Sequence, residues 1–527
     1  MKSAFLAAAC LLVMGCGSSM VSHQSSTAAP GNPGDEYLIP VRPGYISGNP
    51  WWNTYAPRFL YAPAFDFAKV SGSVKYRYTV SSADGEWSFI SAEPNLSLAP
   101  IWNDITPGKV SLKVEGLDGK GEVRGVAGKR DFIRDVPFKG GYPGPARGYR
   151  ESAIGAARYV HGMKGIQSWL TSPEPDLSMR LNTYPCKTFG ATVSLECLLA
   201  GLCPELREEA EAVAKGAAGW LIAHAQANGT PLDGFPPTYY GDKLASARAE
   251  NKGKTMGMEA APVAEAYLDL YDLCGEKRFL EEALRIADTY VRIQSPDGSW
   301  PIKMDLATGE PVNGVKALSA PVLRLFARLE DDYGKSGYRQ SRVRGESYMD
   351  NVAVPSFDMT GQFEDVTVLG LKPYQNLTEC TAAPYASYIL TRKSPSKSAM
   401  SAALDLIRFS EDQFAHWDEY PGSNVNCCPP CVFEQFRYQT PVDHSAAVYA
   451  QALLDWWELT GDARFFEKAK ALIDNLTRVQ NPDTLMLPST WDEWPSKRPN
   501  RDVWINCCLA SVRILLRMDQ IVNKSKI

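Results

Sequence analysis

The sequence predicts a mainly α-helical protein in which a small N-terminal β-sandwich precedes an (α/α)6 toroid, or barrel. Two observations predict this fold. Strand-like alternation is confined to the chain before Gly140, and the helical pattern after Arg150 contains a long-period internal repeat. The composition is that of a folded protein, since 45% of the 527 residues are hydrophobic and 22% are charged. A net charge of −5 without a basic block argues against a nucleic-acid partner.

The N-terminus resembles a bacterial lipoprotein signal peptide. The apolar run from Ala4 to Met14 is shorter than the roughly 20 residues that span a bilayer, but it suits a signal-peptide core. It leads into Val-Met-Gly-Cys, which is similar to a lipobox with Cys16 as the lipidated residue. We expect residues 1–16 to form this peptide and residues 17–50 a flexible tether and entry segment. The predicted location is periplasmic or at the cell surface, with membrane attachment by the lipid anchor only. A plain cleaved secretory signal is the alternative.

Residues 51–140 are predicted to form a fibronectin-like β-sandwich. Side chains alternate with a period of two in Val74–Val80 and in Lys109–Val114, and Asp-Gly turns separate such runs. Short strands with these spacings are typical of a sandwich. Glycine and proline punctuate Gly140–Arg150, which marks the boundary with the barrel at residues 141–527.

The helical region contains a repeat that predicts its architecture. Asp269–Ala283 matches Asp455–Ala469 at one constant offset in the numbering, and weaker echoes occur at Pro204–Ala210 and Ser401–Ile407. If one helical hairpin takes about 62 residues, the offset corresponds to three hairpins and residues 150–527 to six. Six hairpins that each bury one face against their neighbours close into a ring, whereas an open solenoid, the alternative, leaves an end uncovered.

The segments between the predicted helices combine tryptophan with acidic, histidine, arginine and tyrosine residues. Four such segments stand out, beginning at Asp297, Gly361, Gln413 and Trp491. Sugar rings stack on indoles, sugar hydroxyls bond to planar polar groups, and paired carboxyls perform acid–base chemistry on glycosidic bonds. These segments therefore predict a carbohydrate site.

The toroid, the β-domain before it, the Asp-Gly-Ser-Trp loop at Asp297, and the segments ending in Asn-Leu-Thr-Glu379 and starting with Glu434-Gln-Phe-Arg-Tyr resemble the six-hairpin glycosidase superfamily. This superfamily includes unsaturated glucuronyl hydrolases and exo-β-glucuronidases. The resemblance implies an exo-acting glycoside hydrolase for a uronic-acid-containing oligosaccharide of bacterial, plant or algal origin. Two alternatives remain open: a polysaccharide lyase on the same toroid, and a non-catalytic glycan-binding lipoprotein.

A two-carboxyl hydrolase needs one protonated carboxyl beside the leaving oxygen and a second carboxylate that activates water or attacks the sugar. We predict Glu379 and Glu434 as this pair and Asp365 as the reserve; Glu364 and Asp418 are further candidates. In purely structural roles, Glu379 would cap a helix and Glu434 would pair with Arg437.

Further residues are expected to contact the substrate. His416 and Tyr438 would orient it in a hydrolase or act as base and acid in a lyase. Arg437 is a candidate for binding a uronic carboxylate. Trp300, Trp417 and Trp491 are predicted stacking platforms, whereas Trp456 and Trp457 lie on a repeat helix and are expected in the core.

The cysteines allow two interpretations. In an exported protein we expect Cys427, Cys428 and Cys431 to form disulfides with Cys507 or Cys508, and Cys197 with Cys203. On that interpretation the protein needs no cofactor or metal.

The alternative rests on a second resemblance. The Cys-Cys-Pro-Pro element at Cys427 and the Glu379-Cys380 pair are similar to the β-L-arabinofuranosidase family, whose nucleophile is a zinc-bound cysteine. The resemblance implies zinc at Glu379, Cys380, Cys427 and Cys428, with Cys428 as nucleophile. The chain departs from that family by lacking a residue between Glu379 and Cys380, by having Cys431 where asparagine is expected, and by placing its β-domain first.

Overall fold

The structure is a computed structural model. It describes residues 34–42, 52–242, 249–360, 362, 373–420, 427–491 and 503–524, with Arg180 and Cys380 described by their backbone only. Within these ranges no helix is both long and apolar enough to cross a membrane.

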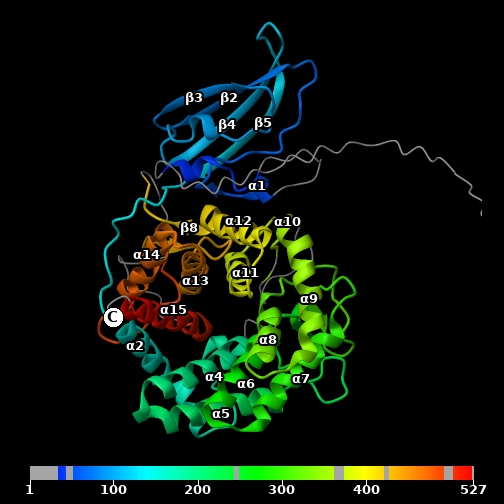
Figure 1. The fold of residues 1–527 in the computed structure, drawn as a ribbon, viewed down its shortest axis with the longest axis vertical. Coiled ribbons are helices and arrows are strands. Elements are labelled where there is room, and N and C mark those ends of the chain that lie inside the picture. The colour runs from blue at the N-terminus through cyan, green and yellow to red at the C-terminus, as the bar shows by residue number, and fades with distance from the viewer. Residues whose placement is uncertain are drawn as a thin grey trace, which may run out of the picture.

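Twelve long helices of the described residues form two concentric rings (Figure 1). Inner and outer helices alternate along the chain, and each inner helix packs against the next inner helix around the ring. The inner helices are α4 (Pro185–Leu202), α6 (Ala260–Cys274), α8 (Ala320–Asp331), α11 (Glu379–Thr391), α13 (Asp443–Thr460) and α15 (Ile505–Lys524). The outer helices are α2 (Tyr149–His161), α5 (Arg207–Ala223), α7 (Lys277–Ile293), α9 (Arg339–Tyr348), α12 (Lys397–Phe414) and α14 (Ala463–Val479). The predicted (α/α)6 barrel is therefore confirmed.

The two ends of the helical region close the ring. The last inner helix, α15, packs against α4, the first inner helix, and against α2, the first outer helix. Since α2 and α15 come from opposite ends of the sequence, their contact completes a sixth hairpin. No end face of the array is left open among the described helices, so the solenoid alternative is wrong.

The sequence explains which helices lie inside. The buried residues of the outer helix α7 follow helical spacing, with Phe279, Ala283, Ile286 and Tyr290 on one face. By contrast, most positions of α4 are buried on all sides, in keeping with its apolar sequence. A helix packed between an outer helix and the ring centre has little surface left for solvent.

The repeat has a structural cause at Asp269 and Asp455, which lie on α6 and α13, three hairpins apart. Asp269 accepts a hydrogen bond from Ser194 on the preceding inner helix at 2.6 Å and binds Arg328 on the following one at 2.7 Å. Asp455 likewise bonds to Ser387 on α11 and to Arg517 on α15. Each aspartate therefore ties three inner helices together.

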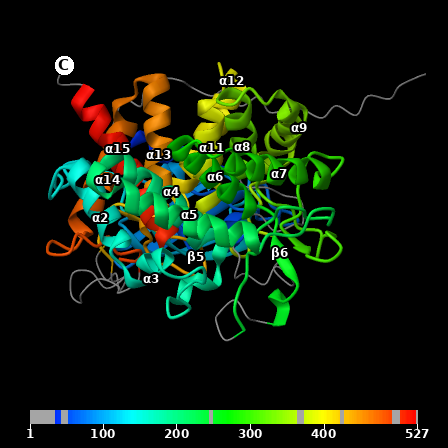
Figure 2. The same cartoon turned by 90° about the horizontal axis from the view of Figure 1, so that it is seen from below.

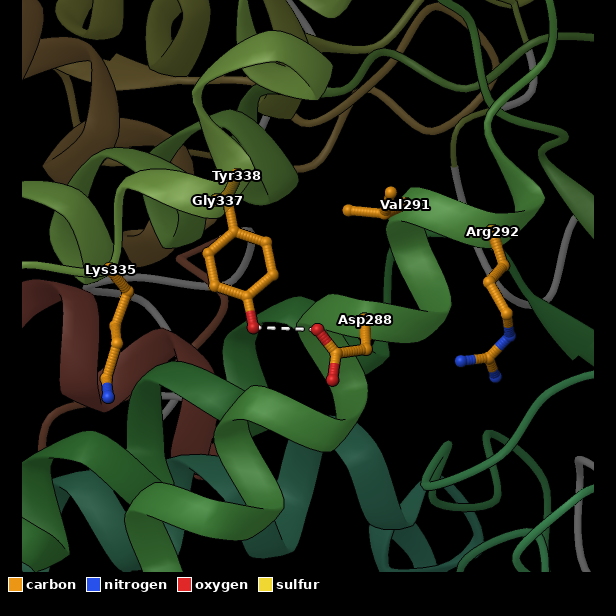
Figure 3. A pocket seen from close by; sticks show the side chains of 6 residues that line it. All are labelled: Asp288, Val291, Arg292, Lys335, Gly337 and Tyr338. Carbon is orange, nitrogen blue, oxygen red and sulfur yellow. Dashed lines mark hydrogen bonds between the residues drawn. The ribbon is translucent and has the colours of Figure 1, made fainter.

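A second repeated contact joins neighbouring outer helices. Asp288 on α7 accepts a hydrogen bond from Tyr338, which precedes α9, at 2.8 Å, and Asp474 on α14 accepts one from Tyr149 on α2 at 2.5 Å. Figure 3 shows the Asp288–Tyr338 contact in a cavity of about 360 Å³ whose rim also carries Arg292. Because Asp474–Tyr149 is its repeat equivalent, this contact serves the packing of outer helices.

The shorter elements connect or flank the helices. α9 continues through a π-helical turn (Met349–Ala353) into α10 (Val354–Ser356). The remaining elements are α1 (Trp52–Tyr55), α3 (Lys164–Gln167), β1 (Arg58–Phe59), β2 (Lys75–Ser82), β3 (Gly85–Ser91), β4 (Gly108–Leu117), β5 (Val123–Arg134), β6 (Lys254–Met256), β7 (Lys303–Asp305), β8 (Ala415–His416) and β9 (Cys431–Val432).

The N-terminal β-domain contains one sheet within the described residues. Its strands have the order β1-β5-β4-β2-β3, and the β5–β4, β4–β2 and β2–β3 pairs are antiparallel. The prediction of a two-sheet sandwich is wrong in this respect, because irregular chain covers the buried face instead of a second sheet. Phe65 and Trp102 from that chain both pack on Phe132 of β5.

The sheet lies on the outside of the ring beside α12 (Figure 1). A buried ion-pair network secures the junction. Lys468 of α14 contacts Glu411 of α12 at 2.8 Å and Glu36 at 3.2 Å, and Tyr61 donates to Glu411 at 2.8 Å. Leu60 and Tyr61 donate their backbone N–H groups to the carboxylate of Asp412. The N-terminal segment is therefore fastened to two outer helices.

Candidate active site at the N-terminal ends of the inner helices

The segments that lead into the inner helices gather at one end of the ring. The β6–β7 pair lies just ahead of α6 and α8, and the β8–β9 pair lies just ahead of α13. Figure 2 shows β6 and its neighbouring loops extending from this end. Loops on a rigid scaffold are where binding and catalytic groups concentrate.

The structure brings Glu379 and Glu434 together at this end. Glu379 is the first residue of α11, and its backbone N–H donates to the carbonyl oxygen of Glu434 at 2.9 Å. Thr378 and Gln435 form an adjacent antiparallel bridge. Asn376 strengthens the connection by donating to Gln435 at 2.6 Å. The loop before α13 is thus held against the start of α11.

The two carboxyls have different surroundings. Glu379 has 0% of its surface exposed, whereas Glu434 is only half-buried. Burial raises the pKa of Glu379 well above its usual range, and the negative charge of Glu434 raises it further. Among the described residues, neither carboxyl oxygen of Glu379 has a hydrogen bond of normal geometry, although the Ser445 hydroxyl lies nearby. Glu379 therefore does not act as a helix cap.

The first turn of α13 contributes a second acid and a histidine. Asp443 is fully buried and accepts a hydrogen bond from Ser511 of α15 at 3.0 Å. Burial raises the pKa of Asp443 well above its usual range. Its neighbour His444 has the opposite shift: burial, together with the charges of Lys187 and Arg324, lowers its pKa to about 4. At neutral pH His444 is therefore an uncharged imidazole.

Basic residues of other inner helices face the same space. Lys187, in the first turn of α4, contacts Glu259 at the start of α6 at 4.0 Å, and its charge acts on both His444 and Cys507. Arg324 of α8 acts on His444 in the same way. Charges on α4 and α8 therefore lie close enough to act on His444 of α13, and the charge on α4 also acts on Cys507 of α15. The site thus combines two buried acids whose pKa values are raised, a neutral imidazole and nearby positive charge.

Sequence reasoning missed Asp443, His444, Lys187 and Arg324 as site residues. The signal for the first two was their place at the end of the segment that begins at Gln413, whereas the repeat gave none, since at its offset they align with Gly257 and Met258. Lys187 and Arg324 gave no comparable signal. Only closure of the ring brings α4 and α8 to the same end as α13.

Other predicted residues lie elsewhere or outside the described residues. Glu364 and Asp365 are among the residues that the structure does not describe. His416 is buried between the sheet and the ring, where its Nδ1 lies 3.1 Å from Asp135. Tyr438 is 41% exposed on the loop after Glu434.

Two candidates lie at the surface. Arg437 is exposed and donates its backbone N–H to Asn376 at 2.9 Å. The side chain of Asp418 is about half exposed, 3.9 Å from Lys139. The roles of His416 and Tyr438 as base and acid of a lyase stay a prediction.

The three predicted stacking platforms are core residues. Trp300, Trp417 and Trp491 are each 0% exposed, so no indole face is open to a sugar. Each indole N–H is satisfied internally, as when Trp300 donates to the carbonyl oxygen of Tyr290 at 2.8 Å. The prediction is wrong because tryptophan in a loop can pack inward as readily as outward.

The predicted disulfides are also wrong for the described cysteines, all of which are free thiols. Cys428 lies 3.9 Å from Asn475 on α14, and Cys507 lies near Asp443 and Glu434. Cys427 hydrogen-bonds with Cys431, which lowers the pKa of Cys427 to about 6. The described thiols therefore contact other groups, and no disulfide joins Cys427, Cys428 or Cys431 to Cys507 or Cys508.

Comparison with known proteins finds similar rings at low sequence identity. No protein-family description and no curated protein matches the sequence. A family 76 glycoside hydrolase from a bovine Bacteroides thetaiotaomicron strain is 8% identical over 86% of this chain and 94% of its own, with a TM-score of 0.45. An unsaturated glucuronyl hydrolase specific for heparin is 12% identical over 71% and 97%, with a TM-score of 0.46. Cellobiose 2-epimerase from Spirochaeta thermophila is 10% identical over 70% and 98%, with a TM-score of 0.47. The reaction of this chain therefore has to be argued from its own residues.

Proposed function

We propose that this protein is a glycoside hydrolase whose active site lies at the N-terminal ends of the inner helices, with Glu379 as the general acid and Glu434 as the second carboxyl. The observation that carries the proposal is the pairing of a fully buried carboxyl with a half-buried one across the hydrogen bond between Glu379 and Glu434. Carboxyls whose environments differ in this way take the acid and base roles of glycosidases.

The roles follow from the surroundings of each group. Because burial raises the pKa of Glu379 well above its usual range and so favours its protonated form, Glu379 can donate a proton to the glycosidic oxygen as the bond to the sugar breaks. Glu434 would then activate the water that adds to the sugar, or attack the sugar carbon itself. Each turnover consumes one water and leaves one new hydroxyl on each fragment.

The positive residues favour an acidic sugar. Lys187 and Arg324 act on the buried imidazole of His444, so a uronic carboxylate placed among these residues would replace part of the solvation that it loses. Arg437, exposed on the loop that carries Glu434, offers a two-pronged contact to the same group. Since Glu379 has no exposed surface, the proposal requires the segments that cover it to move when substrate binds.

An isomerase or epimerase is the second candidate, and His444 favours it. A neutral, fully buried imidazole whose Nδ1 has no hydrogen-bond partner among the described residues can accept a proton from a sugar carbon next to a carbonyl. Such an enzyme would leave the mass of its substrate unchanged. Export and attachment through Cys16 also stay proposals, because residues 1–33 lie outside the described residues.

The general-acid role can be tested with leaving groups of different quality. On a natural oligosaccharide, Glu379→Gln should lower kcat by about 10² to 10⁴, since the leaving oxygen loses its proton donor. On an aryl glycoside with an acidic phenol, which leaves without a proton, the same variant should lose less than about tenfold. The matched control is Glu196→Gln, which changes another buried glutamate on an inner helix, bonded to His161 at 2.8 Å. Equal losses on both substrates would rule out Glu379 as the acid.

A further inference from the structure

A second cluster of metal-binding residue types lies at the junction of the sheet and the ring. One imidazole nitrogen of His416, one carboxylate oxygen of Glu419 and the sulfur of Cys427 all lie within 4.8 Å of one another. His416 and Cys427 are buried, and Glu419 lies at the exposed edge. A fourth residue, Cys431, contacts Cys427 through its thiol, although its sulfur is not among the three ligand atoms that all lie within 4.8 Å of one another.

The strand pairing explains why these residues meet. β8 and β9 pair antiparallel, with His416 directly opposite Cys431. The chain leaves β8 through Glu419 and returns into β9 through Cys427, so both lie close to the paired strands. The Glu419 carboxylate is 3.5 Å from the Cys427 sulfur. The arrangement therefore follows from a short hairpin-like element.

The orientation of His416 is the second, independent observation. Its Nδ1 lies 3.1 Å from both carboxylate oxygens of Asp135, which follows β5. The carboxylate favours a proton on Nδ1, although the guanidinium of Arg58 also lies 3.5 Å from this nitrogen, and a proton there leaves the lone pair on Nε2. That Nε2 is buried, since His416 is only 1% exposed, and it has no hydrogen bond of normal geometry among the described residues, although the Cys427 thiol interacts with the ring. A carboxylate behind a histidine is the usual arrangement behind a zinc-bound imidazole.

The surrounding charge suits two thiolates and a divalent cation. Arg58 forms a buried ion pair with Asp135, donates to the carbonyl oxygen of Ala415 at 2.6 Å and stacks on Phe433. Its charge also acts on Cys427 and Cys431. With Zn²⁺ bound, the charges of two thiolates, Glu419 and Asp135 would be balanced to within one unit by the metal and Arg58. Burial of such a group is costly unless it is balanced.

We propose that His416, Glu419, Cys427 and Cys431 form a structural zinc site that fastens the N-terminal sheet to the ring. The three mutually close donors, joined by the Cys431 sulfur beside Cys427, would make a four-coordinate set of one nitrogen, one oxygen and two sulfurs, as structural zinc sites require. On binding, the Cys431 thiol and any protonated Cys427 thiol release their protons to solvent. Asp135 is the positioning residue, and it brings the end of β5 into the site. This set differs from Glu379, Cys380, Cys427 and Cys428, because Cys428 bonds instead to Asn475.

Metal analysis of the purified full chain tests the proposal, with Cys428→Ser as the matched control for Cys427→Ser. Wild type and Cys428→Ser should each retain about one zinc per chain, whereas Cys427→Ser and His416→Ala should retain less than about a tenth of that. Asp135→Asn should weaken zinc binding by about 10- to 100-fold while leaving all four ligands in place. Cobalt loading of the wild type should give the visible absorbance of a tetrahedral cobalt–thiolate site.

The proposal can also be tested on the wild-type chain, so a folding defect in a variant does not prevent the test. Chelation of the wild-type chain should lower its Tm, and added zinc should restore it, independently of any substitution. Three results would overturn the site: no stoichiometric zinc and no cobalt–thiolate absorbance in the wild type, equal metal loss in the two cysteine variants, or a Cys427–Cys431 disulfide in the native chain.

Discussion

The backbone N–H of Glu379 donates a hydrogen bond of 2.9 Å to the carbonyl oxygen of Glu434. This contact joins the first residue of α11 to the loop that leads into α13. It fixes the relative position of two carboxyls that are distant in the sequence, one buried and one half-buried. The proposed acid–base division depends on that difference in burial.

The pH dependence of turnover should report on Glu379. Burial raises its pKa, and a general acid works only while protonated, so kcat should fall as the pH rises through that pKa. Glu379→Gln has no proton to lose, and its residual activity on an aryl glycoside should lack this alkaline decline. Rate profiles of wild type and variant across neutral to alkaline pH are the measurement. An identical alkaline decline in both proteins would mean that another group causes it.

His444 should make the fold sensitive to acid. Its folded pKa of about 4 lies below the 6.5 of an exposed histidine, so the unfolded chain binds the proton first as the pH falls. Stability contributed by the neutral imidazole is therefore complete above pH 6.5 and is lost as the pH falls toward 4, by up to about 3 kcal/mol. Urea unfolding of wild type and His444→Gln at pH 7 and pH 4.5 measures the difference. If the variant loses as much stability as wild type between the two pH values, this explanation is incorrect.

Asp455 should be more important for stability than an ordinary surface acid. Replacing it with asparagine leaves Arg517 without its buried partner and weakens the bond from Ser387, so we expect a loss of about 2–4 kcal/mol. Asp331→Asn is the control, because its pair with Lys393 is exposed and should contribute less than about 1 kcal/mol. Denaturant unfolding compares the two variants. Similar small losses would mean that the repeat aspartate does not tie the inner helices together.

Trp300 and Tyr438 should have opposite phenotypes. Trp300 is fully buried, so Trp300→Ala should lower stability by about 3–5 kcal/mol. Tyr438 is 41% exposed beside Glu434 in sequence, so Tyr438→Ala should leave Tm nearly unchanged and raise KM by roughly tenfold through the lost sugar contact. Thermal unfolding and steady-state kinetics separate the two effects. A stable Trp300→Ala variant with a raised KM would contradict this expectation and indicate that the indole stacks on the sugar.

The architecture was predictable because the repeat reflects packing. Asp269 and Asp455 occupy equivalent places in the two copies because each binds a serine and an arginine on flanking inner helices. Six hairpins followed from the spacing of the copies. The second sheet of the sandwich was wrongly expected, because alternation in β2 and β4 shows one buried face but does not reveal that irregular chain around Trp102 covers it.

The site was predictable only in part. Glu379 and Glu434 were identified from local sequence, and the structure brings them together. His416 was assigned to the same site, yet Asp135 from the sheet domain holds it at the junction, a partner 281 positions away in the sequence. The burial of the indoles could not be predicted from local sequence either, since Trp417 packs on Phe138 from a distant segment. Long-range contacts decide such roles, and local patterns do not contain them.

The most direct test of hydrolysis is the mass of products formed in ¹⁸O-labelled water from a panel of uronic-acid-containing and neutral oligosaccharides. The account predicts two fragments whose summed mass exceeds that of the substrate by one labelled water, with wild type and Glu196→Gln but not with Glu434→Gln. Fragments that gain no water would show elimination, and an isomer of unchanged mass would show proton transfer at carbon. Either result would contradict the assignment of Glu379 and Glu434 as a hydrolytic pair.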